Sequence, residues 1–530
     1  MKNKKFLNLF RTFSIKLKKK IVYNVFILLI LGALSSFSLP PFNFFLINFF
    51  TFSMFFIFLF KNLNVSSKKI YFLYGWLFGF GYFLTNINWI IISLTFDQDF
   101  SFLLPIALIL IPAFLALFYG IFTFIFCIFN FKNIISSFFL FSLLFGLVEY
   151  IRGNVLTGFP WNLIVHSFAD NIEFLSFLSV IGTYSLNLLV ISFFAAPGIY
   201  ILRQSKKEII ISMLLTLLFP VLLLIYNASY KNFFLSKELK ENSYIIRVIS
   251  SNISLDRFYK NKDTENVINE LINLSSPDPE KKIFFLWPEG IIPDTYQDEL
   301  DLYSDLFKKN FTKNHLVGLG ITNRLAKEKE YKFFNSFSIF DNNLNLLNNY
   351  NKVNLVPFGE FLPFENFLNK FGLKTITNNF SSFTAGDQRN KIEFKNDFKG
   401  LSFLPLICYE IIYSGKLTKN FNFDYILNIS EDGWFGNSVG PKQHFAHSIF
   451  RAIENGKYVI RSSNNGMGAI INPLGEIEKK IDYGKDGYID FTSRRDMELT
   501  IFSKYGNKIF LILILLYIFL IFSFNRITND

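Results

Sequence analysis

The sequence predicts an α/β layered domain inserted between the transmembrane helices of an eight-helix membrane bundle. Seven long apolar segments occupy residues 21–228, and an eighth lies within residues 506–530. Between them, residues 229–505 alternate strand-like and helix-like stretches and are numerous enough to form a core of their own. The composition agrees, because 51% of the 530 residues are hydrophobic and 72 of them are phenylalanine.

The first twenty residues are basic, contain no acidic residue and lead directly into the apolar run 21–39. This beginning is similar to that of a signal peptide, but no small-residue cleavage site follows, so we expect an uncleaved transmembrane helix. The other predicted spans are residues 44–60, 70–94, 102–129, 134–150, 174–202, 209–226 and 509–524.

Basic side chains lie in alternate connections between these segments, at Lys61, Lys68, Lys69, Lys132, Arg203, Lys206 and Lys207. The positive-inside rule places these connections and the basic segment 1–20 in the cytoplasm. Residues 229–505 are then expected on the outer face of the membrane. Both termini are expected in the cytoplasm, with residues 506–530 forming the eighth helix and a tail.

Short apolar runs in the polar region predict strands at 244–250, 283–287, 316–321, 336–340, 401–407, 425–429, 457–460 and 467–471. Helical patterns cover 263–274, 297–309 and 442–455. The net charge of +12 does not indicate nucleic-acid binding, because the lysines lie beside apolar segments and form no basic, aromatic-interleaved patch. No Gly-rich phosphate loop or metal-ligand spacing occurs, so neither a cofactor nor a metal is expected.

Three reactive side chains each follow a short stretch that leads up to them: Glu289 after 284–288, Lys352 after Tyr350-Asn351, and Cys408 after Leu406-Ile407. The only other cysteine, Cys127, lies in an apolar segment, so no disulfide is expected. A thiol of ordinary pKa is only a few per cent thiolate at neutral pH, and nucleophilic use requires a nearby base or cation. A buried core thiol is the alternative interpretation of Cys408.

The charges of Glu289 and Lys352 suggest separate roles for these two residues beside Cys408. A lysine about 4 Å from a thiolate favours it by roughly 1 to 4 kcal/mol, depending on the effective dielectric, whereas a carboxylate opposes it. Glu289 is therefore best used as a proton acceptor during attack by Cys408, with Lys352 stabilising the developing oxyanion. The product would be a thioester.

Two other clusters have competing interpretations. His444 and His447 lie one helical turn apart and would suit a cysteine protease, but a surface or core-satisfying pair is favoured. In the connection that ends at Trp161, Glu149 and Arg152 have the spacing to pair across one turn. Trp161 itself is either an interfacial anchor or part of the site.

The three reactive residues and their contexts resemble the Glu-Lys-Cys triad of the nitrilase superfamily, which implies an αββα sandwich. The whole chain resembles the apolipoprotein N-acyltransferase family, since the connection from Glu149 to Trp161 also matches. The matching motifs are Trp287-Pro288-Glu289, Tyr350-Asn351-Lys352, Leu355-Val356-Pro357-Phe358-Gly359-Glu360, Ile407-Cys408-Tyr409-Glu410, Asp432-Gly433-Trp434-Phe435-Gly436 and Arg451-Ala452-Ile453-Glu454.

The resemblance implies a bacterial inner membrane, with residues 229–505 facing the periplasm. It also implies a two-step acyl transfer without a cofactor. Cys408 would take an acyl chain from a phospholipid such as phosphatidylethanolamine and pass it to the α-amino group of the N-terminal diacylglyceryl-cysteine of apolipoproteins. Glu289 would be the base and Lys352 the stabilising cation. The resemblance further implies support from Glu360, Tyr409 and Glu410, and substrate contacts by Trp287, Tyr259 and Trp161. A monomer is expected.

The chain departs from the family pattern in two places. Leu255 and Tyr259 stand where a Gln and a Trp are usual, and Asn464-Asn465-Gly466 replaces Asn-Thr-Gly. Both departures concern substrate contacts and leave the three reactive residues intact.

A lipid substrate also follows from the solvation of acyl chains. Moving about fifteen methylenes into water costs roughly 12 kcal/mol, so a lipid acyltransferase should work at the bilayer surface. The alternative functions are a membrane-anchored amidase that hydrolyses a small amide and, less favoured, a transporter with an accessory domain. The aromatic stretch 361–371 is either a lid that dips into the membrane or part of the domain core.

Overall fold

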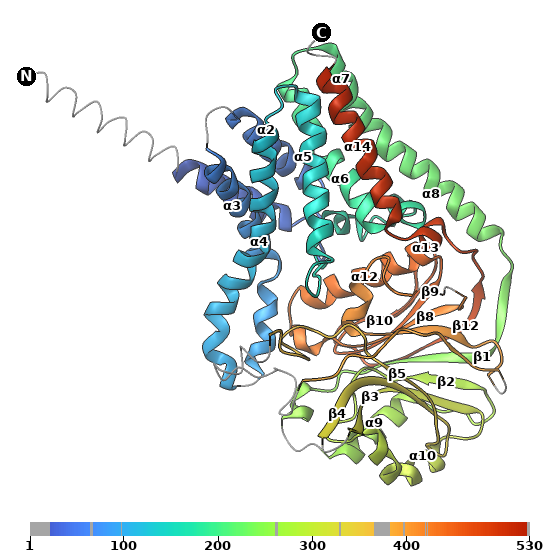
Figure 1. Ribbon diagram of the computed structural model, residues 1–530. Coiled ribbons are helices and arrows are strands. Elements are labelled where there is room, and N and C mark those ends of the chain that lie inside the picture. Colours follow the sequence, from blue (N-terminus) through green and yellow to red (C-terminus); the bar gives the residue numbers. More distant parts are fainter. Residues whose placement is uncertain are drawn as a thin grey trace, which may run out of the picture.

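Two β-sheets lie face to face in one half of the structure, and a bundle of apolar helices forms the other half (Figure 1). The computed structural model describes residues 22–63, 67–96, 98–259, 263–327, 330–364, 382–395, 398–418, 420 and 422–526. The basic segment 1–20 lies outside this described part.

Each of the eight predicted apolar segments contains a helix. In chain order these are Val22–Ser36, α2 (Ile47–Asn62), α3 (Lys68–Asn86), α4 (Leu104–Phe129), α5 (Ile134–Arg152), α6 (Leu178–Leu202), α8 (Phe219–Ser236) and α14 (Lys508–Arg526). A short helix α7 (Lys206–Met213) and a π-helical turn η5 (Leu214–Leu218) precede α8. Within the described residues, five helices are long and apolar enough to cross a membrane, or six if a bent pair counts as one span. Val22–Ser36 and α2 are shorter, so the count of eight spans stays a prediction.

The third apolar segment is bent, whereas the sequence predicts one straight helix over 70–94. Helix α3 ends at Asn86, and the 3₁₀ segment η1 (Asn88–Thr95) continues at an angle of 48°. Asn86 is buried and accepts a hydrogen bond from the amide of Asn162 at 3.0 Å. The bend brings the indole N–H of Trp89 to the side chain of Gln443, 3.1 Å away.

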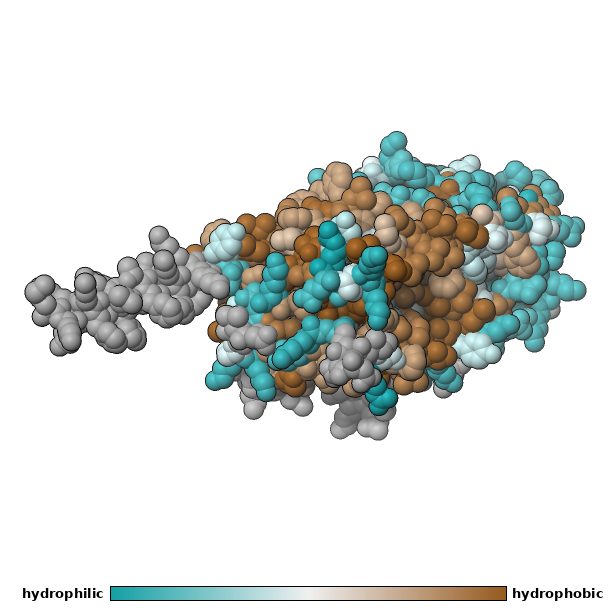
Figure 2. Space-filling view, turned by 90° about the horizontal axis from the view of Figure 1, so that it is seen from above, coloured by the Kyte–Doolittle hydropathy of each residue, from teal (hydrophilic) through white to brown (hydrophobic). Residues whose placement is uncertain are grey.

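The helices divide into a buried centre and an apolar outer surface. In α5, 83% of the most apolar stretch is buried, against 17% in α14. Figure 2 shows hydrophobic side chains spread over the helical end of the molecule. The exposed residues include Leu217, Leu222, Ile225, Leu511, Ile512 and Leu515. An apolar outer surface of this kind suits contact with lipid.

Each sheet has six strands. The first sheet has the order β12-β1-β2-β3-β4-β5 and the second β11-β10-β9-β8-β7-β6. The strands of the first are β1 (Leu239–Ser250), β2 (Ile283–Leu286), β3 (His315–Lys327), β4 (Glu330–Phe340), β5 (Leu346–Asn351) and β12 (Gly487–Arg495). Those of the second are β6 (Ile392–Glu393), β7 (Ser402–Ile407), β8 (Tyr425–Glu431), β9 (Tyr458–Asn464), β10 (Gly468–Ile471) and β11 (Ile477–Ile481). The central runs β1-β2-β3 and β7-β8-β9 are parallel.

Helices cover both outer faces of the paired sheets, which confirms the predicted layered α/β sandwich (Figure 1). Phe284 and Phe403 meet between the sheets with ring centroids 5.8 Å apart. Helices α9 (Thr264–Ser275) and α10 (Ser304–Asn310) cover the first sheet. Helix α12 (Gly440–Asn455) lies between the second sheet and the membrane helices, and its apolar residues belong to the same cluster as those of the bundle.

The eight predicted strands and the helices at 263–274 and 442–455 occur as expected, while 297–309 divides into a 3₁₀ turn and α10. Strands β5, β6, β11 and β12 were not predicted from the sequence. These strands are short or rich in polar residues, and so lack the two-sided apolar run used for prediction.

Candidate active site

Cys408 follows β7, a strand whose six residues are all buried. The apolar run folds as a buried strand because both faces of this sheet are covered. Cys408 then begins the 3₁₀ turn η9 (Cys408–Ile412) with a φ of 47°, in the left-handed region that non-glycine residues seldom adopt. The thiol is therefore carried on a sharp bend and not on the strand itself.

Glu289 and Lys352 meet in a buried ion pair. Glu289 follows β2, Lys352 follows β5, and these strands belong to the sheet facing that of Cys408. The Lys352 Nζ lies 3.1 Å from Glu289 Oε1 and 2.9 Å from Glu360 Oε1. The Lys352 ammonium therefore pairs with two carboxylates, and all three side chains are buried.

Two further donors fix the carboxylates. The amide of Asn335, in β4, donates to Glu289 Oε1 at 2.8 Å and to Glu360 Oε1 at 2.6 Å. The backbone N–H of Glu431 donates to the other Glu289 oxygen at 2.9 Å. Gly320 permits this arrangement, because a Cβ there would lie 2.4 Å from the Cα of Glu289.

The pKa shifts in the site indicate that Lys352 is protonated and that the Cys408 thiol is neutral. Burial lowers the pKa of Lys352, but Glu289 and Glu360 raise it by more, so the ammonium persists. Burial raises the pKa of the Cys408 thiol well above its usual range; Glu289 raises it further and Lys352 lowers it. The Glu289 carboxylate and the Lys352 ammonium shift the pKa of Cys408 in opposite directions, so the thiol lies within electrostatic reach of the ion pair. A thiol of this kind reacts only if a base removes its proton.

Glu410 binds the segment that follows Lys352. Its Oε1 accepts from the backbone N–H groups of Val353 and Asn354 at 2.9 and 3.0 Å, and its Oε2 accepts from that of Ile407 at 2.9 Å. The Arg389 guanidinium pairs with it at 3.0 Å. Glu410 thus connects the segments carrying Lys352 and Cys408, although no hydrogen bond joins it to either side chain in the described part of the chain.

The Tyr409 side chain points toward the half of the molecule formed by the apolar helices. Its hydroxyl donates to the backbone oxygen of Gly158 at 3.1 Å, and Tyr413 donates to that of Thr157 at 2.9 Å. Both acceptors lie in the connection between α5 and α6. Two hydrogen bonds therefore connect the segment after Cys408 to a loop of the helical bundle.

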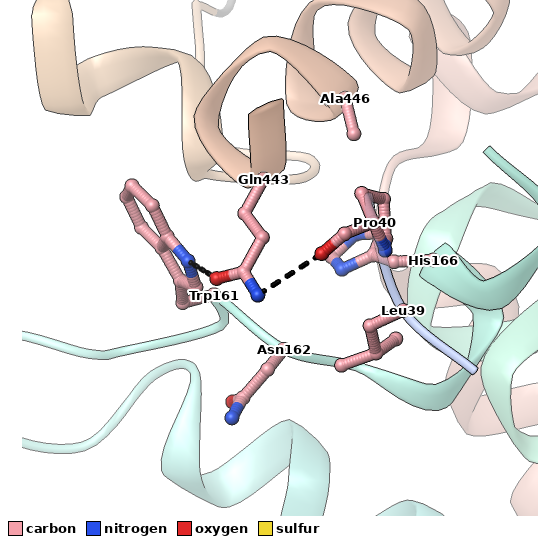
Figure 3. Close-up of a pocket in the computed structure, with 7 residues that line it drawn as sticks. All are labelled: Leu39, Pro40, Trp161, Asn162, His166, Gln443 and Ala446. Atoms are coloured by element: carbon pink, nitrogen blue, oxygen red, sulfur yellow. Dashed lines mark hydrogen bonds between the residues drawn. The ribbon is translucent and has the colours of Figure 1, made fainter. Parts of the chain in front are cut away.

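Trp161, from the same connection, lies against α12 and lines a small cavity (Figure 3). Its indole N–H donates to the side-chain oxygen of Gln443 at 2.9 Å, and the Gln443 amide donates to the backbone oxygen of Pro40 at 3.2 Å. The cavity is lined by Leu39, Pro40, Trp161, Asn162, His166, Gln443 and Ala446. Trp161 is 2% exposed, so it is packed inside the protein at the junction of the two halves.

Two other residues expected to contact the substrate, Trp287 and Tyr259, have no hydrogen bond to the Glu289–Lys352 pair in the described structure. Trp287 is buried among the residues between the first sheet and its helices, and its N–H donates to Ser275 at 2.8 Å. The structure does not bring it to the ion pair. Tyr259 is 38% exposed at the end of η6 (Leu255–Phe258). Of the stretch 361–371, only 361–364 lie in the described part, where Leu362 is buried and Phe364 is 77% exposed.

The two histidines of α12 are buried. His444 Nδ1 lies 2.9 Å from Asp432 Oδ1, and His447 Nε2 lies 3.1 Å from the backbone oxygen of Trp161. They are therefore core residues, one of the two settings that the sequence analysis favoured. No group of His, Cys, Asp and Glu residues able to hold a metal ion was found among the described residues.

Sequence reasoning missed Asn335, Arg389 and Gln443 as parts of the site. Asn335 directly precedes a predicted strand, Arg389 precedes an unpredicted one, and Gln443 lies on a predicted helix. Their partners are distant in sequence, so composition and spacing carried no signal for them.

A membrane-integrated enzyme with a carbon-nitrogen hydrolase domain is the class that this fold and site define. Two family models match: "Apolipoprotein N-acyltransferase N-terminal domain" over residues 31–196, and "Carbon-nitrogen hydrolase" over residues 286–497. The chain belongs to the apolipoprotein N-acyltransferase family, as its motifs predicted.

Curated relatives support this membership. Apolipoprotein N-acyltransferase of Rhizobium leguminosarum bv. trifolii is 32% identical over 88% of this chain and 89% of its own length. That of Rickettsia prowazekii is 32% identical over 95% of this chain and 99% of its own length. A solved variant of the Nesterenkonia AN1 amidase, from the nitrilase superfamily, covers 48% of this chain and 91% of its own, with 11% identity and a TM-score of 0.34.

Proposed function

We propose that this chain transfers an acyl chain from a phospholipid to the α-amino group of the N-terminal diacylglyceryl-cysteine of apolipoproteins, through a thioester on Cys408. The observation that carries the proposal is the buried pair of Lys352 and Glu289, 3.1 Å apart, whose charges both act on the Cys408 thiol. Family membership supports the reaction class, and the names of the relatives suggest the acceptor.

In the first step Glu289 takes the thiol proton as the Cys408 sulfur attacks the ester carbonyl of the phospholipid. The oxygen that gains negative charge is stabilised by the Lys352 ammonium. Collapse of the intermediate breaks the ester bond, and Glu289 returns the proton to the departing lysophospholipid oxygen. The thioester remains on the enzyme.

In the second step the α-amine attacks the thioester carbonyl and gives a proton to Glu289. The carbon–sulfur bond breaks, the sulfur recovers the proton, and an amide is released. Glu360 shares the Lys352 ammonium with Glu289 and is proposed to keep it in place. Tyr409 and Glu410 are proposed to support the site through the backbone, with Trp161 and Tyr259 as substrate contacts. Trp287, being buried away from the ion pair, is proposed to support Glu289 through packing.

The membrane arrangement is a further part of the proposal. We infer eight spans, with residues 229–505 forming a periplasmic catalytic domain between the seventh and the eighth and with both termini in the cytoplasm. The basic connections, such as the one with Lys132, support this orientation. An impermeant thiol reagent applied to intact cells should label Lys485→Cys and not Lys132→Cys, both in a Cys127→Ala background. The reverse labelling would contradict the orientation.

Intact-mass analysis of the purified, detergent-solubilised chain with phosphatidylethanolamine tests the reaction. Wild type should gain the mass of one acyl chain, Cys408→Ala should not, and a diacylglyceryl lipopeptide should remove the added mass and become acylated. Cys127→Ala is the matched control and should behave as wild type. A wild type that never acylates would contradict the proposal, and release of the acyl group only to water would indicate a hydrolase.

A further inference from the structure

The backbone of Cys408 is strained and needs support from its surroundings. A non-glycine residue with a φ of 47° pays an energetic cost, and such a conformation persists where neighbouring groups hold it. The backbone oxygen of Cys408 lies 3.3 Å from Nε2 of His444, a residue of α12. A side chain from another element thus contacts the nucleophile's own peptide group.

The His444 ring is held from its other side by a buried cluster. Its Nδ1 lies 2.9 Å from Asp432 Oδ1 and 3.2 Å from Arg461 Nη2. Arg461 also donates to both oxygens of Asp432, at 3.0 and 2.8 Å. All three side chains are inaccessible to solvent. The orientation of the imidazole is therefore fixed.

The protonation of the ring follows from these partners. A carbonyl oxygen only accepts, so a hydrogen bond to Cys408 requires a hydrogen on Nε2. The charged ring meets this requirement and also donates from Nδ1 to Asp432 Oδ1, 2.9 Å away. In a neutral ring with its hydrogen on Nε2, Nδ1 accepts from Arg461.

A residue from the half formed by the apolar helices covers one face of the His444 ring. Trp161 stacks on His444 with centroids 5.3 Å apart and an interplanar angle of 17°. Gln443, the preceding residue of α12, holds the Trp161 indole. By contrast, no hydrogen bond joins His447 to Cys408 or Asp432 within the described residues, although it is equally buried one turn away.

We propose that His444 is a positioning residue for the nucleophile: it donates its Nε2–H to the Cys408 backbone oxygen and holds Cys408 in the left-handed conformation. This conformation presents the thiol to Glu289 and Lys352. The inference rests on the proposed function, in which Cys408 forms the thioester. His444 itself exchanges no proton with the substrate in this role.

Two amide substitutions separate this role from simple packing. In His444→Gln the side-chain amide reaches the place of Nε2 and can donate to Cys408. In His444→Asn it reaches only the place of Nδ1, beside Asp432. The full-length chain in detergent is mixed with phosphatidylethanolamine, and the rate of acyl-enzyme formation is followed by intact mass over a range of lipid concentrations. His447→Asn is the matched control.

We expect His444→Asn to acylate about 10²-fold more slowly than wild type, because displacement of a reacting group by about 1 Å costs this much. The lipid concentration giving half the maximal rate should stay unchanged, since lipid binding is not affected. His444→Gln and His447→Asn should stay within about tenfold of wild type by the same reasoning. Melting temperatures show whether each variant is folded.

Several results would overturn the inference. Equal rates for His444→Asn and His444→Gln would show that the Nε2–H donor is irrelevant, whether both are fast or both are slow. A loss in His447→Asn as large as that in His444→Asn would indicate general disruption of α12. A wild type that acquires no acyl mass would overturn the proposed function and this inference with it, so the two failures are distinguishable.

Discussion

The Glu410 carboxylate accepts a hydrogen bond from the backbone N–H of Val353 at 2.9 Å. Glu410 lies two residues after Cys408, and Val353 directly follows Lys352. The contact therefore joins the turn that carries the thiol to the segment that carries the ammonium, across the two sheets. One buried carboxylate sets the separation of the proposed nucleophile and cation without touching either side chain.

Replacement of Glu410 by alanine should weaken both stability and activity. It leaves Arg389, which is 5% exposed, without its carboxylate partner, and loss of one member of a buried pair costs about 3–5 kcal/mol. The free energy of unfolding should fall by about that amount, and acyl-enzyme formation should slow because the Lys352 segment loosens. Thermal melting and intact mass measure the two effects. Glu393→Ala, which breaks an exposed pair with Lys391, should change neither; a wild-type melting curve for Glu410→Ala would contradict the prediction.

Asn335→Asp should move the pH dependence of acylation to higher pH. Burial raises the pKa of Glu360, Lys352 lowers it and Glu289 raises it. A third carboxylate at position 335 adds another like charge, which raises the pKa of Glu360 further. Fewer molecules then hold Glu360 ionised beside Lys352 near neutral pH, so the rate there should fall and recover as the pH rises.

The readout for Asn335→Asp is the rate of acyl-enzyme formation measured across a pH series. Asn349→Asp, on the neighbouring strand β5, is the control and should keep the wild-type profile because Asn349 does not contact either glutamate in the described structure. An unshifted profile for Asn335→Asp would show that the amide has no influence on the carboxylates.

The sequence predicted the parts of the site that depend on local pattern. The run 403–407 before Cys408 is apolar at every position, so β7 and the residue at its end were predictable, and the same holds for β2 and Glu289. Strand β5, which ends just before Lys352, exposes its two leucines and contains three asparagines, so it lacks a buried apolar run and was not predicted. Lys352 was found through its neighbours in the chain, Tyr350 and Asn351.

The supporting contacts were beyond sequence reasoning because they join distant segments. Glu410 was expected near the site, yet its partners are backbone N–H groups, which any residue supplies. Likewise, the helical pattern of 442–455 places Gln443 and His444 on a helix, while their contacts with Trp161 and Cys408 depend on how the bundle meets the sheets. The bend after Asn86 depends on the same packing.

The Cys408 thiol should react slowly with alkylating agents near neutral pH. Burial and Glu289 hold its pKa well above the ordinary value of 9.0, and only the thiolate is nucleophilic. The alkylation rate should rise with pH and continue to rise beyond pH 9.0, because the thiolate fraction increases until the pH passes the raised pKa. The measurement is mass-detected iodoacetamide labelling in a Cys127→Ala background, which leaves Cys408 as the only cysteine.

Lys352→Met supplies the comparison for the alkylation experiment. Lys352 lowers the pKa of Cys408, so its removal should raise that pKa further and slow labelling at every pH below it. The denatured chain, free of burial, should label faster than the native one. Rapid labelling of the native protein that levels off below pH 9.0 would show that the thiol is already activated in the resting state.

Arg152→Met should destabilise the helical bundle strongly. Arg152 donates to Glu149 Oε2 at 2.5 Å and to Asn162 Oδ1 at 3.0 Å, and neither charged side chain is more than 1% exposed. Removing the guanidinium leaves the Glu149 carboxylate buried without a partner, at a cost of about 3–5 kcal/mol. The double variant Glu149→Gln with Arg152→Met removes both charges and should melt closer to wild type than Arg152→Met alone. Thermal unfolding in detergent measures this, and a double variant less stable than either single variant would mean that the charges contribute separately and not as a pair.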